Sequence, residues 1–191
     1  MNKLLNLLTK PHLIPKKIIK KLNYYLELKK YNQNIFENNQ NKIFEKLELN
    51  RELGIEKLKS IKKEYNLDFD RTMSSEHEVL FSSISKNKNI SIQNILEIGT
   101  FDGYNAILLS KLFPNSTIDT IDLPNKNEDF INFYERKNIV KKFIEKRDKI
   151  LSNEHKINFI QMNSLNLINH IKKYDLIWID GAHGYPVVCV D

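Results

Sequence analysis

The sequence predicts an α/β fold built on a doubly wound, mainly parallel β-sheet that follows a helical N-terminal extension. Short, nearly continuous apolar runs alternate with helical patterns between residues 92 and 180. Strands that lack an exposed polar face are typical of parallel sheets buried on both sides. Each apolar run also ends in a polar or glycine-containing turn. Because ligands of such sheets bind beyond the carboxyl ends of the strands, we expect the functional site there.

Residues 1–70 are expected to form a basic, amphipathic helical extension rather than a second core. Residues 16–30, KKIIKKLNYYLELKK, place Ile, Leu and Tyr side chains on one face of a helix and most Lys side chains away from it. The helical pattern continues through residues 33–65, where Gly54 is expected to interrupt it. Residues 71–191 are then expected to form the α/β domain.

The expected elements of the α/β domain follow one another along the chain. The stretch SEHE matches a capping box, with Ser75 as the N-cap and Glu78 turned back toward it, and it predicts a helix through about Ser85. The remaining expected elements are a strand at 92–98, a helix at 106–113 that Pro114 ends, a strand at 116–123, a long helical stretch at 128–152, a strand at 157–162, a short helix at 165–171 and a strand at 174–180.

The positive charge of the chain belongs to the N-terminal extension. The net charge is +6, but residues 1–30 hold eight Lys and one Glu, so that residues 31–191 carry a net charge of −1. This distribution argues against a nucleic-acid-binding protein, which carries its positive charge on the folded domain. The basic helix at 16–30 could lie on an anionic membrane surface or bind an acidic partner, or it could pack on its own domain or on a neighbouring subunit of a homo-oligomer.

The cysteine content and the hydrophobic pattern both indicate a cytoplasmic protein. The chain holds one cysteine, Cys189, which excludes an intramolecular disulfide and fits a reducing compartment. The apolar stretch LLNLL at residues 4–8 is too short for a secretory signal, and no run reaches transmembrane length. We expect a cytoplasmic location, with the helix at 16–30 as the segment suited to peripheral contact with the inner face of the membrane.

The turn after the first expected strand, EIGTFDG, contains two of the five glycines in the chain. A nicotinamide-dinucleotide fingerprint needs G-x-G-x-x-G, but Phe101 and Tyr104 stand where its second and third glycines should fall. Glu97, Gly99 and Gly103 instead match three points of an E-x-G-x-G-x-G turn, with Phe101 in place of the middle glycine. On these residues the chain resembles the class I S-adenosylmethionine-dependent methyltransferases, whose Rossmann-like sheet agrees with the expected fold.

The resemblance implies a binding site for S-adenosylmethionine at the ends of the strands. It implies that Glu97 holds the ammonium group of the methyl donor, that Asp122 accepts hydrogen bonds from both ribose hydroxyls, and that Asn163 stands where the family often has an acid bonded to the adenine amino group. Bare backbone at Gly99 and Gly103 would let the amino-acid end of the donor lie close. The expected cofactor-binding residues are Glu97, Gly99, Thr100, Phe101, Gly103, Asp122, Leu123, Asn163, Ser164 and Asp180.

A second stretch, YDLIWIDGAHGYPVVCVD at residues 174–191, looks like the D-G-x-H-x-Y segment of a methyltransferase subfamily that includes small-molecule and sugar O-methyltransferases. With SSEHEVLF before the first strand, the resemblance extends from about Arg71 to Asp191. It implies that Asp180 lies beside the donor's sulfonium, where metal-dependent relatives also bind a divalent cation. His183 is the candidate general base or substrate contact, because an imidazole can accept a hydroxyl proton near neutral pH. It could instead cap the next helix or fix the loop.

The favoured hypothesis is therefore a methyltransferase that acts on a hydroxyl group of a small molecule or sugar, with Asp180 and His183 as the catalytic residues. Since the family fold continues with further strands beyond the point that matches Asp191, we expect the domain to be incomplete at its C-terminus. The alternative is a catalytically silent binding or interaction module, part of a larger protein, that its basic helix attaches to a membrane or an assembly. Metal ligands beyond Asp180 cannot be assigned from the sequence.

Overall fold

The computed structural model describes residues 23–24, 26, 32–67, 76–132, 140–169 and 171–181. The chain divides into two compact units, Met1–Glu48 and Leu49–Asp191. In the first unit, helix α3 (Gln33–Lys46) begins after Asn32, whose side-chain oxygen accepts hydrogen bonds from the next backbone N–H groups. Such a cap satisfies amides that have no partner inside the helix. Of the basic helix expected at 16–30, only residues 23, 24 and 26 are described, and they are helical.

Two separate helices cover residues 33–65. Helix α4 (Arg51–Glu64) begins after Asn50, whose side-chain oxygen accepts a hydrogen bond of 2.9 Å from the Leu53 N–H group. The helical stretch therefore breaks at an N-cap rather than at Gly54, which lies inside α4. The prediction that Gly54 interrupts the stretch is wrong, since the signal that divides it is the capping residue of the second helix.

Gly54 serves instead as a contact point between α4 and α5 (His77–Lys86). A Cβ atom on Gly54 would lie 2.0 Å from Ser83 Oγ and 2.9 Å from the Val79 carbonyl oxygen of α5. No side chain fits at these distances in a close-packed interior. The missing side chain of Gly54 lets the two helices approach closely.

Two ion pairs also fasten α4 to the start of α5. Arg51 Nη2 lies 2.8 Å from Glu76 Oε1, and Lys62 Nζ lies 2.5 Å from Glu78 Oε2. Glu76 precedes α5 and makes no side-chain cap, while Ser75 lies outside the described residues. Glu78, expected to turn back toward Ser75, is thus paired with α4, and the capping box stays a prediction.

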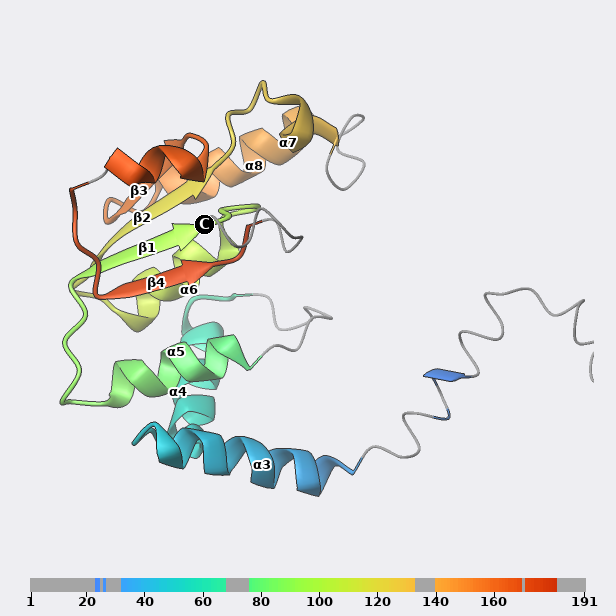
Figure 1. Ribbon diagram of the computed structural model, residues 1–191, viewed down its shortest axis with the longest axis vertical. Helices are drawn as coiled ribbons and strands as arrows, with labels where there is room; N and C mark the ends of the chain where they lie inside the picture. The colour runs from blue at the N-terminus through green and yellow to red at the C-terminus, as the bar shows by residue number, and fades with distance from the viewer. Residues whose placement is uncertain are drawn as a thin grey trace, which may run out of the picture. The chain divides into compact units, whose positions relative to one another are not determined.

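Four parallel strands form the sheet of the second unit, in the order β3-β2-β1-β4 (Figure 1). Ile98 of β1 lies opposite Ile121 of β2 on one side and Ile179 of β4 on the other, so the carboxyl ends of these strands reach the same edge. The predicted doubly wound, parallel α/β sheet is confirmed, because the later strands lie on both sides of β1. The strands are β1 (Asn94–Ile98), β2 (Thr117–Asp122), β3 (Ile157–Gln161) and β4 (Leu176–Ile179).

The two faces of the sheet carry different coverings. On one face, α4, α5 and α6 (Tyr104–Leu112) build the main core with β1 and β2, and Leu151 of α8 (Val140–Ser152) packs with Ala106 and Ile107 of α6. On the other face, a smaller cluster contacts Leu167 of the 3-10 helix η3 (Ser164–Asn169). The main core comprises Leu58, Ile61, Phe81, Ile95, Leu108, Leu109, Leu112, Phe113 and Ile118, and the smaller cluster comprises Leu96, Ile98 and Ile121.

Two of the expected helices differ in detail from the structure. The short helix expected at 165–171 is the 3-10 helix η3. The long stretch expected at 128–152 is described as α7 (Glu128–Asn132) and α8, and residues 133–139 lie outside the described part. In the part of the chain that the structure describes, no helix combines the length and the apolar character needed to cross a membrane.

Candidate functional site

The turn between β1 and α6 runs through three residues with left-handed backbone conformations. The angle φ is +105° at Gly99, +48° at Phe101 and +80° at Gly103. Glycine adopts such angles without a steric penalty, whereas Phe101 does so only because the surrounding structure holds it there. The N–H groups of Gly99 and Thr100 both donate to the Ile121 carbonyl oxygen, at 2.8 and 3.2 Å, which ties the turn to the end of β2.

Both glycines of this turn face atoms of the protein itself. A Cβ atom on Gly99 would lie 2.3 Å from the carbonyl oxygen of Asp180, at the end of β4, and one on Gly103 would lie 2.9 Å from Leu151 Cδ2 of α8. These contacts give the two glycines a structural reason, while the expected close approach of a ligand stays a prediction. Their missing side chains allow the ends of β1 and β4 to meet and allow α8 to pack against the turn.

Asp122 ends β2 and holds the tip of the turn. Its Oδ2 accepts the Phe101 N–H at 3.0 Å, and its Oδ1 accepts the Leu123 N–H at 2.8 Å. The Phe101 ring is 41% exposed and lies 5.3 Å from the ring of Phe143 in α8. Asp122 itself is half-buried at the end of β2, beside the turn that it holds.

Glu97 is an acid buried inside the sheet next to the turn. It is 1% exposed, and both of its oxygens accept hydrogen bonds, from Thr120 Oγ1 at 2.5 Å and from Asn105 Nδ2 at 2.7 Å. Thr100 Oγ1 lies 2.7 Å from Thr120 Oγ1. Since the Thr120 proton is directed to Glu97, Thr100 is the donor of this second bond. The network joins β1, β2, the turn and the start of α6.

The charge of Glu97 is poorly compensated. Burial raises the pKa of Glu97 from 4.5 to about 7, and the carboxylates of Asp180 and Asp122 also raise it, against the hydrogen bonds from Thr120 and Asn105. Both hydrogen-bond partners are neutral, so they cannot balance a full negative charge. Asn105 Oδ1 is buried and has no hydrogen-bond partner among the described residues. A cationic donor group beside Glu97 and Asn105 would satisfy both.

Thr120 and Asn105 were not predicted from the sequence. Thr120 lies directly opposite Glu97 in the register of β1 and β2, so the strand alignment could have placed it, because opposite residues share a face of the sheet. Asn105 lies in the first turn of α6, and no motif singles it out.

Asn163 and Ser164 follow the end of β3. The Met162 N–H donates to the Asp122 carbonyl oxygen at 2.9 Å, which places the end of β3 beside that of β2. Asn163 Oδ1 accepts the Leu165 N–H at 2.9 Å and so begins η3, and Ser164 is half-buried. One acceptor site of the Asn163 oxygen is therefore used by the fold, and a second remains.

Asp180 follows β4 and completes the acidic edge. Its N–H donates to the Ile98 carbonyl oxygen at 2.7 Å, and its side chain is exposed. The structure thus brings the predicted acids Glu97, Asp122 and Asp180 to one edge of the sheet, while His183 lies outside the described residues. A glycine turn and acidic side chains thus lie at the carboxyl edge of a Rossmann-like, doubly wound sheet, the edge at which ligands of such sheets bind.

No metal site is formed within the described part of the chain. There, no group of three or more His, Cys, Asp and Glu side chains is arranged to hold a metal ion. Asp180 is described, but the rest of the expected D-G-x-H-x-Y segment after Gly181 is not. The divalent cation implied by that segment therefore has no ligand set among the described residues.

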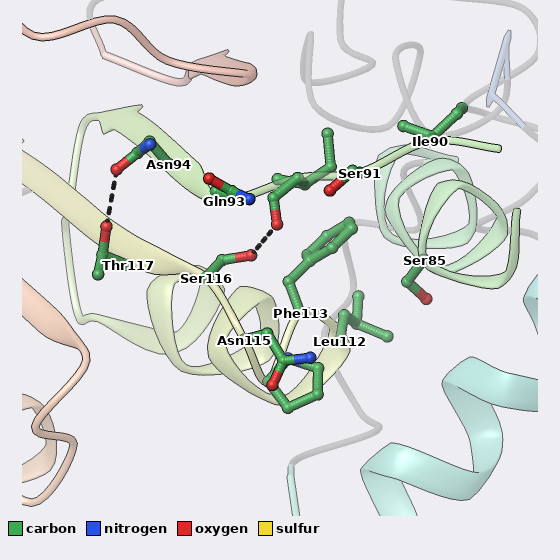
Figure 2. A pocket seen from close by; sticks show the side chains of 12 residues that line it. Ser85, Ile90, Ser91, Gln93, Asn94, Leu112, Phe113, Asn115, Ser116 and Thr117 are labelled. Atoms are coloured by element: carbon green, nitrogen blue, oxygen red, sulfur yellow. Dashed lines mark hydrogen bonds between the residues drawn. The ribbon is translucent and has the colours of Figure 1, made fainter. Parts of the chain in front are cut away.

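A cavity of about 570 Å³ lies at the opposite, amino end of β1 and β2 (Figure 2). Asn94 and Thr117, the first residues of the two strands, line it, and none of its lining side chains is ionisable. The Ser116 and Thr117 hydroxyls donate to the Ile92 carbonyl oxygen and to Asn94 Oδ1, at 2.7 and 3.1 Å. Because none of the predicted site residues lines this cavity, we place the candidate site at the carboxyl edge.

Comparisons with known proteins return methyltransferases among the solved structures. No protein-family model and no curated protein matches the chain. The chain spans between 54% and 59% of the three solved structures named here. The first is a candidate caffeoyl-CoA O-methyltransferase from Staphylococcus aureus, with 19% identity over 84% of this chain and 59% of that one and a TM-score of 0.38. The second is an O-methyltransferase from Bacillus cereus in complex with SAH, with 20% identity over 67% of this chain and 54% of that one and a TM-score of 0.36. The third is the O-methyltransferase TomG from Streptomyces achromogenes, involved in tomaymycin synthesis and in complex with SAM, with 18% identity over 74% of this chain and 59% of that one and a TM-score of 0.39.

Proposed function

We propose that the protein is an S-adenosylmethionine-dependent methyltransferase that transfers a methyl group to a hydroxyl of a small molecule or sugar. The observation that carries this proposal is the buried Glu97 carboxylate, which has neutral hydrogen-bond partners and two acidic neighbours at the ligand-binding edge. S-adenosylmethionine carries a sulfonium and an ammonium group, and opposite charge nearby favours the ionised form of a carboxylate. A cationic ligand therefore suits this edge, and the Glu97, Gly99 and Gly103 pattern points to the same ligand.

The amino-acid end of the donor fits the buried network around Glu97. A buried acceptor without a partner is unfavourable, and Asn105 Oδ1 is such an acceptor within the described residues. We assign Glu97 and Asn105 to the donor's ammonium group, which they would bind directly or through water. A cation at this place would also lower the pKa of Glu97 and keep the carboxylate ionised.

The adenosine end fits the ends of β2 and β3. We assign Asp122, the acid at the end of β2, to the two ribose hydroxyls, because a carboxylate accepts hydrogen bonds through both of its oxygens, and Leu123 to the ribose or adenine surface beside it. The second acceptor site of the Asn163 oxygen would bind the adenine amino group, and the Ser164 N–H would donate to the adenine ring. The turn residues Gly99, Thr100, Phe101 and Gly103 would shape the wall between the two ends.

The chemistry asks mainly for positioning. When bound, S-adenosylmethionine supplies a methyl group on a sulfonium, which is a good leaving group. The protein's part is to hold the acceptor hydroxyl in line with the methyl carbon and to accept its proton. We assign Asp180, exposed at the end of β4, to the charge beside the sulfonium, and His183 to proton removal.

The other expectations from the sequence are kept as part of the proposal. They are a helical extension that ends near residue 70, a cytoplasmic location, contact of the helix at 16–30 with a membrane surface or with another subunit, and a divalent cation near Asp180. No nucleic-acid partner is proposed, because the positive charge lies in residues 1–30.

Isothermal titration with S-adenosylhomocysteine and S-adenosylmethionine tests the proposal. We expect the chain, or a longer form that its gene encodes, to bind both ligands, and Asp122→Ala to weaken binding at least about tenfold, the effect of losing charged hydrogen bonds. Asp129→Ala, which removes an exposed acid from α7, is the matched control and should bind normally. A folded chain that binds neither ligand would remove the methyltransferase proposal and leave the silent binding module.

A further inference from the structure

Arg147 of α8 is a buried cation that the proposed chemistry does not use. Its side chain is 0% exposed. Its Nε and Nη2 atoms donate to Asp148 Oδ1 at 2.9 and 2.8 Å, and Nη2 also donates to Asn125 Oδ1 at 2.8 Å. Its Nη1 atom has no hydrogen-bond partner among the described residues. A buried guanidinium that is only partly satisfied is unfavourable for folding, so its presence calls for an explanation.

Two aromatic rings hold the Arg147 guanidinium in place. Its Cζ atom lies 4.3 Å from the centre of the Phe159 ring in β3 and 5.6 Å from that of the buried Phe130 in α7. Planar guanidinium groups stack on aromatic faces, and they can bond two acceptors at once through their fork of N–H groups. Arg147 therefore joins α8 to β3 and to α7 through the two rings, and it joins α8 to the turn after β2 through Asn125.

Asn125 carries this link to the ends of β2 and β3. The Asn125 N–H donates to Gln161 Oε1 at 3.0 Å, while Asn125 Oδ1 accepts from Arg147. Gln161 is the last residue of β3 and lies opposite Asp122 in the sheet. The chain of bonds from Arg147 through Asn125 to Gln161 thus braces the turn that begins directly after Asp122.

We propose that Arg147 is a positioning residue that fixes the turn at residues 123–127 and thereby shapes the adenosine half of the donor site. The inference rests on the proposed function, in which Asp122 binds the ribose and Asn163 binds the adenine. Arg147 is fully buried and acts through Asn125, without touching the ligand. A lysine would retain the charge but not the fork that reaches Asn125 and Asp148 together.

The test compares two ligands that share the adenosine half, S-adenosylhomocysteine and 5′-methylthioadenosine, by isothermal titration into the full chain. We expect Arg147→Met and Asn125→Ala to lower the affinity for both ligands by the same factor, about tenfold, and Arg147→Lys to lie between them and wild type. Arg147→Met leaves Asp148 without its ion pair, but the Asp148 side chain is 46% exposed, so that water can solvate its charge. Arg147→Met should therefore fold, and thermal unfolding followed by circular dichroism checks this. If Arg147→Met does not fold, the ligand affinities of Asn125→Ala test the proposal instead.

Two control variants separate this role from a structural one. Lys111→Met removes the 2.5 Å ion pair between α6 and Glu154, which lies just before the amino end of β3 and away from the carboxyl ends of the strands, and it should leave both affinities unchanged. Asn105→Ala should weaken the binding of S-adenosylhomocysteine but not that of 5′-methylthioadenosine, which lacks the amino-acid end.

Wild-type affinity in both Arg147→Met and Asn125→Ala, or a loss of affinity confined to S-adenosylhomocysteine, would overturn the proposal. If wild type binds neither ligand, the proposed function itself fails and this inference falls with it.

Discussion

A carboxylate buried as deeply as that of Glu97 ionises only when its surroundings compensate its charge. Thr120 and Asn105 do so in part, and burial still raises the pKa of Glu97 to about 7. Between the ordinary pKa of 4.5 and this value, the folded chain keeps a proton that the unfolded chain has released. The free energy of unfolding therefore falls as the pH rises through this range, because the folded state binds more protons.

We expect Glu97→Gln to remove this pH dependence. A shift of this size corresponds to roughly 3 kcal/mol of wild-type stability that is present below about pH 4.5 and lost above about pH 7. Relative to wild type, Glu97→Gln should therefore become more stable as the pH rises from about 5 to about 8, as measured by urea unfolding at several pH values. Glu128→Gln, at an exposed acid of α7, should track wild type throughout. A difference between Glu97→Gln and wild type that stays constant with pH would contradict this electrostatic account.

The residues of the candidate site divide into those that local sequence predicts and those that it does not. Glu97 was predicted because it matches, together with Gly99 and Gly103, the glycine turn of the family that the sequence resembles, and Asp122 was predicted from its place at the end of an apolar run. Asn105, Thr120 and Arg147 were not, because their roles depend on which strands and helices become neighbours. A buried arginine in particular has the same local pattern as an exposed one, and only the two flanking rings distinguish Arg147.

At the scale of elements, the strands were predicted closely because apolar runs bounded by polar residues leave little choice of position. The first expected strand, 92–98, is observed as Asn94–Ile98, and the second, 116–123, as Thr117–Asp122. The helical stretch before them was divided at the wrong place. Local propensity treats Gly54 as a helix breaker, whereas the contact with α5 decides its role.

We expect Gly54→Ala to destabilise the protein. A methyl group would meet Ser83 Oγ and the Val79 carbonyl oxygen inside 3.0 Å, and overpacking of this kind typically lowers the free energy of unfolding by about 1–3 kcal/mol. The gain in helix propensity, about 1 kcal/mol, offsets only part of this. Urea unfolding measures the difference.

Two further variants identify the cause of the Gly54→Ala effect. Ser60→Ala, at an exposed position of α4, should change the free energy of unfolding by less than about 0.5 kcal/mol. Ser83→Ala combined with Gly54→Ala should recover part of the loss, because it removes the Oγ atom but leaves the clash with the Val79 backbone. Stabilisation by Gly54→Ala alone would show that α4 and α5 are not packed as closely as the structure has them.

At the scale of the second unit, the two ends of the sheet differ in chemistry. Glu97, Asp122 and Asp180 gather at the carboxyl edge, while the cavity at the amino edge is lined by uncharged side chains. The sequence predicts the acidic edge, since parallel strands end on the same side. It does not predict the cavity, because that lining comes from helix ends and strand starts that only the fold brings together. The acidic edge is therefore where ligand binding and ionisation can be coupled.

Ligand binding should be linked to the ionisation of Glu97. If the ligand's ammonium group pairs with the ionised carboxylate, binding is tighter above the pKa of about 7 than below it. Roughly a tenth of the Glu97 side chains are ionised one pH unit below that pKa and roughly nine tenths one unit above it, so the affinity should differ by up to about tenfold. For a chain of this size, that difference corresponds to roughly 3–6 °C in the ligand-induced rise of Tm.

The measurement is the Tm shift produced by excess S-adenosylhomocysteine at about pH 6 and about pH 8. Wild type should show the larger shift at the higher pH, and Glu97→Gln should show equal shifts at both, because its side chain does not titrate. Asp129→Asn, an exposed acid outside the site, should keep the wild-type difference and so excludes a general effect of charge. Equal shifts in wild type would mean that the ligand binds without engaging Glu97. The chain would then still bind the ligand, but the ligand's ammonium group would have to be assigned to another residue of the acidic edge.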